Sequence, residues 1–307
     1  MTARQTRAAA IRAAAPDGFS FAATVQSHGW RNLAPYAFDD ATGTLAVVWR
    51  LQNDAPVGLE LREVAGGISA RPNRALTAGE RTAVLARIRY AFAFDADTSG
   101  LHAMCRREPH LRWIARRGMG RLLRGEDLFE DALKTLLTTN CTWTQTIAMT
   151  RRLVDVCGPV DSKSGGRAFP SPRAVLAAGA ALLDAEVRLG YRTRAAIELA
   201  ELAAENGLAA VLAEDPPAAR KRIRSWFGFG PYAAASLLQV LGRNDEVVVD
   251  SWATAQARLH FFGGRKCTPA QIRRIYAPYG PEAARIAWFD LNREHFGVRG
   301  KRPKLRT

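Results

Sequence analysis

The stretch IRSWFGFGPYAAASLLQVLGRNDEVVVDSW, residues 223–252, decides the fold predicted for this chain. It contains a Gly-Phe-Gly turn at 228–230, and two glycines permit positive φ angles and leave no Cβ in the way of an approaching group. Pro231 follows at a first-turn position, where its missing N–H costs nothing. Residues 233–236 have small side chains, which leave the N-terminus of the next helix accessible. An anion can therefore bind to the free backbone amides there. The stretch therefore predicts two helices joined by a hairpin that offers a seat for a phosphate.

An apolar run and one acid close the same stretch. Residues 247–249 are three valines, and β-branched side chains favour an extended, buried segment. Asp250 follows at the rim of that segment. Because Asp is among the preferred N-cap residues, its position alone favours a simple cap for a helix over 251–261. A catalytic carboxylate is the other interpretation.

The charge balance narrows the classes of partner. The chain has 307 residues, with 44 Lys and Arg against 29 Asp and Glu, a formal net charge of +15. This charge points to a polyanion, most simply nucleic acid, and the alternative is a protein that is basic through biased composition. No apolar span is long enough to cross a bilayer, so we expect no membrane contact. The cysteines at 105, 141, 157 and 267 are too widely spaced for a zinc site, which predicts no metal and a reducing cytoplasm.

Two kinds of hydrophobic pattern divide the chain. Apolar residues alternate between residues 19 and 71, most clearly at 19–25, 45–51 and 57–64, which predicts an antiparallel sheet of four or five strands. Thr77 and Glu80 match a capping box for the helix that follows, and turn residues at 97–100 mark a boundary. We therefore predict an α+β protein. Its parts are a basic, poorly ordered arm or short helix at 1–16, a β-rich domain at 17–99, a helical domain at 100–297 and a basic tail at 298–307.

A second group of polar residues joins two amphipathic helices predicted at 128–137 and 143–157. The junction reads Thr138-Thr-Asn-Cys-Thr142. Thr and Asn at such a place normally satisfy the ends of helices, so spacing alone favours a capping role for Asn140. The functional alternative is that Asn140 projects towards a DNA duplex and fills the space left by an extruded base.

Several pieces of the sequence occur together in one known family. They are Arg121-Leu-Leu-Arg-Gly-Glu-Asp-Leu-Phe-Glu-Asp131, Thr138-Thr-Asn140, Phe169-Pro-Ser-Pro172, Leu189-Gly-Tyr-Arg-Thr-Arg194, the hairpin with Val249-Asp250, and the closing segments Thr268–Tyr276 and Ala287–Leu291. In this order they resemble the helix-hairpin-helix DNA glycosylase superfamily, in the branch that holds alkylpurine (3-methyladenine) and 8-oxoguanine glycosylases. The likeness covers about residues 100–297, and the β-rich N-terminus resembles the first domain of that branch more weakly.

The resemblance assigns roles to particular residues. It makes Asp250 the catalytic carboxylate and places Asn140 near the vacated base position. The residues that it puts at a DNA phosphate are Gly228, Phe229, Gly230 and Ala233. Members that cleave the DNA strand carry a lysine where this chain has Tyr232, and the alkylpurine branch carries an aromatic residue there. The resemblance therefore implies base excision without lyase chemistry.

Two departures from the family pattern affect these assignments. Phe227 stands where a proline usually precedes the first hairpin glycine, which puts the detailed geometry of the turn in question. The C-terminal four-cysteine iron–sulfur cluster of one subgroup is absent, so we expect no cofactor.

The chemistry of base removal fits one carboxylate and several electron-rich rings. Breaking an N-glycosidic bond develops positive charge on the deoxyribose, which a fixed carboxylate stabilises. An alkylated purine is already cationic, and aromatic rings attract it by stacking and cation–π interactions. The candidate walls of the base pocket are Tyr232, Trp143, Trp252 and Trp288. Residue type alone favours the hydrophobic core for each ring, because Trp and Tyr also close the interfaces between helices. The damaged base must first be flipped out of the duplex.

We therefore predict a monofunctional DNA glycosylase that excises damaged, alkylated purines in base excision repair. Its expected partner is double-stranded DNA with a damaged base. We expect a monomer in the bacterial cytoplasm. The alternatives are an 8-oxoguanine-type glycosylase whose lysine is lost or relocated, and a helix-hairpin-helix protein that binds DNA without chemistry.

Overall fold

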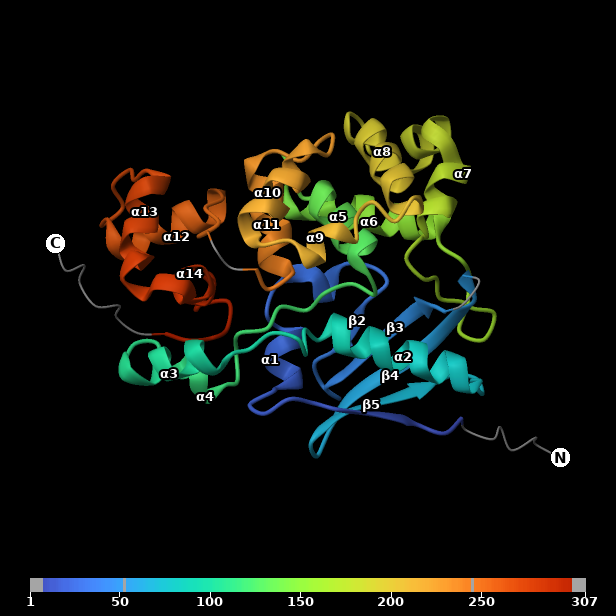
Figure 1. Ribbon diagram of the computed structural model, residues 1–307, viewed down its shortest axis with the longest axis horizontal. Helices are drawn as coiled ribbons and strands as arrows, with labels where there is room; N and C mark the ends of the chain where they lie inside the picture. Colours follow the sequence, from blue (N-terminus) through green and yellow to red (C-terminus); the bar gives the residue numbers. More distant parts are fainter. Residues whose placement is uncertain (1–7, 52–53, 244–245, 300–307) are drawn as a thin grey trace.

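The computed structural model describes residues 8–51, 54–243 and 246–299. Near its N-terminus lies a five-stranded antiparallel sheet in the order β1-β5-β4-β3-β2. The strands are β1 (Ile11–Ala14), β2 (Ala37–Asp39), β3 (Thr44–Arg50), β4 (Pro56–Val64) and β5 (Gly67–Pro72). The helix α2 (Ala78–Ala91) packs on this sheet and begins with the predicted capping box of Thr77 and Glu80. The antiparallel sheet and the α+β class are confirmed (Figure 1).

Two predictions for the N-terminal region were wrong. Residues 11–14, assigned to a basic arm, form β1, because Ile11 and Ala13 face the core while the backbone pairs with β5. Residues 1–7 of that arm lie outside the described residues. The alternating segment near residue 21 is a short helix, α1 (Phe21–Val25), and not a strand. Ser20 starts this helix by accepting a hydrogen bond from the Ala23 amide at 3.2 Å, a local preference that outweighs the alternation.

The first group of helices forms a core that carries the hairpin. Its members are α5 (Leu128–Leu137), α6 (Trp143–Cys157), α7 (Pro172–Leu182), the π-helical turn η3 (Leu183–Val187), α8 (Arg192–Ala204), α9 (Ala210–Ala213), α10 (Pro216–Ser225) and α11 (Pro231–Val240). The helices predicted at 128–137 and 143–157 agree with α5 and α6. The apolar faces of α10 and α11 meet as expected, with Ile223, Trp226 and Leu237 buried in one cluster.

A second group of helices forms a separate core from two distant parts of the chain. It combines α3 (Ser99–Arg107) and α4 (Arg112–Arg116) with α12 (Ser251–Phe261), α13 (Pro269–Tyr276), the 3-10 turn η4 (Ala277–Glu282) and α14 (Ala283–Leu291). Figure 1 shows α3 and α4 beside α14, at the end of the molecule away from the sheet. The region after residue 100 therefore folds around two hydrophobic cores, and the chain leaves the second core at 119–127 and returns to it at 247.

The valine run that enters the second core was predicted to be extended and buried, and its burial is only partial. Residues 247–249 form no strand, and only Val247 is buried. All five strands of the sheet lie between residues 11 and 72, so no neighbouring strand is available to pair with the run. The segment serves instead as the connection that brings Asp250 to the start of α12.

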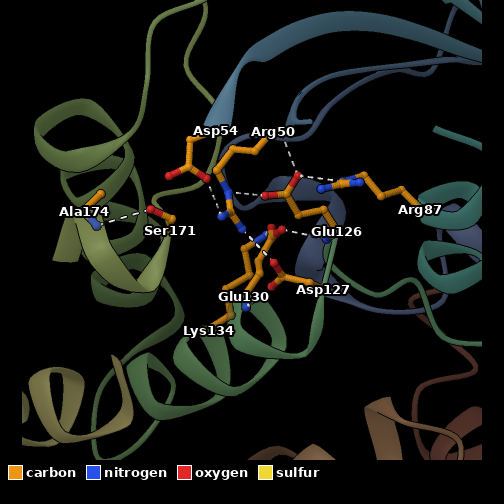
Figure 2. A network of polar contacts seen from close by, with 9 residues as sticks. All are labelled: Arg50, Asp54, Arg87, Glu126, Asp127, Glu130, Lys134, Ser171 and Ala174. Atoms are coloured by element: carbon orange, nitrogen blue, oxygen red, sulfur yellow. Dashed lines mark hydrogen bonds and ion pairs between the residues drawn. The ribbon is translucent and has the colours of Figure 1, made fainter. Parts of the chain in front are cut away.

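A buried polar network holds α5 against the sheet (Figure 2). Arg50, at the end of β3, pairs with Glu126 through Nε and Oε1 at 2.5 Å and with Asp127 through Nη2 and Oδ2 at 2.7 Å. Burial opposes the charge on Arg50, but the surrounding carboxylates raise its pKa overall. One helical turn further, Lys134 is fully buried and pairs with Glu130 at 2.5 Å. Because Asp127 is also the N-cap of α5, the network fixes the helix that leads to the Asn140 junction.

Candidate active site and nucleic-acid interface

The hairpin turn between α10 and α11 has one glycine that faces the protein and one that faces outward. Gly228 has a φ of 84°, and a Cβ there would lie 2.7 Å from the Ala195 Cβ and 3.0 Å from Leu136 Cδ1. Gly228 therefore lets the turn pack on α8 and α5, whereas the sequence suggested room for an approaching group. Gly230 has a φ of −76°, and a Cβ there would meet nothing within 4 Å. The open side of the turn is at Gly230.

The outward side of the turn leads directly to the N-terminus of α11. Gly230 is the N-cap residue and supplies no side chain to the amides of the first turn. The Ala233 side chain is buried, and so is Phe229, whose ring meets Trp226 edge-on at 5.3 Å between centroids. Only backbone atoms of Phe229 and Ala233 can therefore reach a ligand here. An unsatisfied helix N-terminus beside an open glycine can bind an anion.

Asp250 is the N-cap of α12, as its position in the sequence predicts. Its Oδ1 accepts a hydrogen bond from the Ala253 amide at 2.6 Å, and its carbonyl oxygen accepts one from the Thr254 amide at 2.9 Å. The cap uses one carboxylate oxygen. Among the described residues no hydrogen bond engages the second oxygen, Oδ2, and the half-buried residue keeps a side open to solvent.

Tyr232 brings the hairpin and Asp250 together. It is in the first turn of α11, and its side chain is partly exposed. Burial raises the pKa of the Tyr232 phenol, and the nearby Asp250 carboxylate raises it further. The side chains of Ser236 and Thr138 approach the same hydroxyl and act in the opposite direction. The structure thus gathers the start of α11, the start of α12 and the end of α5 around one phenol.

Asn140 lies in an exposed turn and caps neither neighbouring helix. The C-cap of α5 is Thr138, and Thr142 forms a capping box at the start of α6. Asn140 has a left-handed φ of 46°, and its Nδ2 donates a hydrogen bond to the Tyr191 hydroxyl at 3.2 Å. The Arg192 guanidinium stacks on the Tyr191 ring, 4.4 Å from the centroid. The capping interpretation of Asn140 was wrong, because Thr138 caps the end of α5 and Thr142 caps the start of α6.

The three candidate tryptophans have different surroundings. Trp143 is at the start of α6 and packs on Gly29, where a Cβ would come within 2.4 Å of the indole. Trp252 is in the first turn of α12 and is half exposed. Trp288 on α14 donates from Nε1 to the Ser27 carbonyl oxygen at 3.0 Å, which ties it to the end of α1. Trp252 thus shares its helical turn with the Asp250 cap, while Trp143 and Trp288 pack on the segment at residues 27–29.

Sequence reasoning gave no role to some residues at this face. Tyr191 was part of a quoted motif only, and its contact with Asn140 spans 51 positions. Thr138 and Ser236 were read as parts of helix ends, although both approach Tyr232. A hydrophilic residue one helical turn after Tyr232, in an otherwise apolar helix, is the one signal that could have marked Ser236.

The described residues contain neither a metal-binding cluster nor a membrane span. No group of three or more His, Cys, Asp or Glu side chains within 8–51, 54–243 and 246–299 could hold a metal ion. In the same ranges no helix has the length and apolar character needed to cross a bilayer.

The fold is shared with several solved structures at low sequence identity. The sequence matches no family model and no curated protein. The 3-methyladenine DNA-glycosylase from Archaeoglobus fulgidus superposes with a TM-score of 0.73 at 18% identity, over 94% of this chain and 99% of that one. MBOgg1, in complex with a low-affinity DNA ligand, gives 0.70 at 17% identity over 94% and 96%. The Clostridium acetobutylicum 8-oxoguanine glycosylase/lyase, with DNA containing cytosine opposite 8-oxoguanine, gives 0.65 at 14% over 88% and 93%. The chain therefore has the fold of these helix-hairpin-helix DNA glycosylases.

Proposed function

We propose that this protein is a monofunctional DNA glycosylase that releases alkylated purines by hydrolysis of the N-glycosidic bond. The observation that carries the proposal is that Asp250 lies near enough to Tyr232, beside the hairpin turn, for its charge to raise the pKa of the phenol. The carboxylate supplies the charge that the reaction needs, and the aromatic ring occupies the place where a lyase would need an amine. The helical region after residue 100 would be the catalytic unit, and the β-rich region before it a supporting domain.

Asp250 would stabilise the transition state through its charge. The sugar becomes positively charged as the base leaves, and a fixed carboxylate lowers that barrier more than mobile water does. The hydrogen bond from the Ala253 amide at 2.6 Å fixes Oδ1. The N-terminus of α12 favours the negative charge. Oδ2 is then the oxygen that faces the sugar and orients the attacking water.

The rings near Asp250 would select the leaving base. Tyr232 and Trp252 are both partly exposed and flank the start of α12. A purine alkylated at N3 or N7 is cationic, so the faces of such rings attract it. Because the leaving group is already activated by its charge, one carboxylate suffices and no second acid is needed. Trp143 and Trp288 would form more distant walls.

DNA would be held at two places while the base is flipped. The open amides beside Gly230 would bind a phosphate of the lesion strand. Asn140, exposed in its left-handed turn and held by Tyr191, would enter the space that the flipped base vacates. The formal charge of +15 supplies salt-dependent affinity for the backbone. Flipping a base out of the duplex costs roughly a few kcal/mol, and it costs least where the base is damaged or mispaired.

The absence of lyase chemistry would follow from the lack of an amine at Tyr232. A phenol cannot form a Schiff base with the sugar aldehyde, whereas a lysine can. Lys134 cannot replace it, because it is fully buried and paired with Glu130 at 2.5 Å.

The test is base release from duplexes that each contain one defined lesion. The substrates are N3-methyladenine, N7-methylguanine, 8-oxoguanine and an unmodified control, with wild type compared to Asp250→Asn. We expect the wild type to release the methylated bases and the variant to lose this activity. Equal release by both proteins would overturn the proposal. Borohydride should trap no covalent DNA adduct, and a trapped adduct would contradict the monofunctional assignment.

The same panel separates the alternatives. Preferential release of 8-oxoguanine would favour the oxidised-purine enzyme, whose known structures this chain also resembles in fold. Tight, salt-sensitive binding without release of any base would favour a protein that binds DNA without chemistry.

A further inference from the structure

An arginine and a phenylalanine from different helices stack beside the hairpin turn. The Arg194 guanidinium on α8 is 4.1 Å from the centroid of the Phe227 ring, which belongs to the turn itself. Both side chains are exposed, Arg194 at 71% and Phe227 at 44%. The Phe227 ring is thus only partly buried, and its face carries the Arg194 guanidinium.

The stack has a fixed position relative to the open side of the hairpin. Ala195 follows Arg194 on α8. A Cβ added at Gly228 would lie 2.7 Å from the Cβ of Ala195. The close approach holds the start of α8 against the turn, because any larger residue at 228 would separate them. Arg194 therefore projects from a helix that packs on the turn, and its guanidinium lies over Phe227, three residues before Gly230.

The guanidinium keeps most of its donors available. Its Nε donates to the Glu198 carboxylate at 2.7 Å, one helical turn along α8. This ion pair is exposed on both sides, and such pairs contribute little. The two terminal nitrogens carry four further N–H groups. Stacking on the ring and the Glu198 contact together fix the plane of the fork, which reduces the entropy lost when it binds a planar or tetrahedral oxyanion.

We propose that Arg194, supported by Phe227, binds a second backbone phosphate of DNA next to the phosphate held at Gly230. This inference rests on the DNA-binding part of the proposed function. Two adjacent phosphate contacts on a rigid frame would fix the direction of the strand across the turn, which one contact cannot do. The Phe227 ring would act as a support for Arg194 and make no contact that reads a base.

The test is the salt dependence of binding to a duplex with a stable abasic-site analogue. Fluorescence anisotropy gives the Kd between 50 and 200 mM salt for wild type, Arg194→Gln, Phe227→Leu and the double variant. Arg62→Gln is the matched control, since Arg62 lies on β4 and its side chain is 52% exposed. Loss of one phosphate contact should reduce the slope of log Kd against log salt by about 0.9. Between 50 and 200 mM salt, the Kd of the variant should therefore rise about threefold less than the Kd of wild type.

We expect Arg194→Gln to reduce the slope and Arg62→Gln to leave it closer to wild type. Phe227→Leu should weaken binding in the wild-type background but not in the Arg194→Gln background, because the ring acts only through the guanidinium. An unchanged slope in Arg194→Gln, equal effects at Arg62, or additive effects of the two substitutions would overturn the inference. The measurement needs no base release, so failure of the glycosylase assignment would be seen separately in the lesion panel.

Discussion

Asp250 performs two tasks in the proposed mechanism, and substitutions can separate them. As a cap it accepts the Ala253 amide at 2.6 Å. As a catalyst it would face the sugar with its charge. Asn and Ser both cap helices well, but neither carries a charge. Ala does neither. Asp250→Asn and Asp250→Ser should therefore remove only the catalytic task, and Asp250→Ala should remove both.

The size of each effect follows from where Asp250 lies. The residue is half-buried, so an intermediate effective dielectric of about 20 applies, and opposite charges at about 4 Å then attract by roughly 4 kcal/mol. That energy corresponds to a loss of about 10³-fold in the rate of base release. Loss of the cap costs about 1 kcal/mol of the free energy of unfolding.

The assay is single-turnover release of the preferred base with enzyme in excess, together with urea unfolding of each variant. All three variants should lose about 10³-fold in rate, and only Asp250→Ala should lose about 1 kcal/mol in stability. A rate for Asp250→Asn within tenfold of wild type would refute the catalytic role. A stable Asp250→Ala would refute the capping role while leaving the catalytic role intact.

Three further predictions concern stability and binding. Gly228→Ala should cost about 1–3 kcal/mol in urea unfolding, because it strains a left-handed backbone and meets Ala195, while Gly230→Ala should keep its stability and weaken DNA binding in anisotropy titrations. Burial lowers the pKa of His28 from 6.5 to about 4. Between pH 6.5 and about pH 4, His28 is therefore protonated in the unfolded chain but neutral in the folded protein. Wild type should therefore lose about 3 kcal/mol relative to His28→Gln as pH falls through that window, and parallel stability curves would contradict this. Glu126→Gln should cost about 1–3 kcal/mol in the same unfolding assay, since Arg50 keeps its ion pair with Asp127 but loses a buried acceptor at its Nε.

Local rules explain what the sequence predicted well. The hairpin, the capping boxes and the Asp250 cap each depend on residues within four positions of one another, where propensity and hydrogen bonding act directly. The same rules failed at residues 21–25 because an alternating pattern over five residues also fits one helical turn behind a serine cap. Short segments carry too few residues to distinguish the two periods.

Contacts between distant segments could not be predicted in this way. The sequence shows that Gly228 lacks a Cβ but not that Ala195 and Leu136 occupy the space. It shows Asn140 in a polar junction but not the Tyr191 hydroxyl that holds it. Each of these pairs depends on how two helices pack, and packing is set by the whole core rather than by spacing along the chain.

The candidate site lies at the seam between the two helical cores, so its geometry depends on what joins them. Tyr232 belongs to a helix of the first core, and Asp250 starts a helix of the second. Arg124, only 2% exposed, lies in the segment that runs between them and donates to the Val240 and Leu241 carbonyl oxygens at 3.1 and 3.0 Å. A cation at a helix C-terminus stabilises that end and fixes the axis of α11. Because a shift of about 1 Å at reacting groups can cost about 10²-fold in rate, we expect this remote arginine to influence base release through the position of the helix that carries Tyr232.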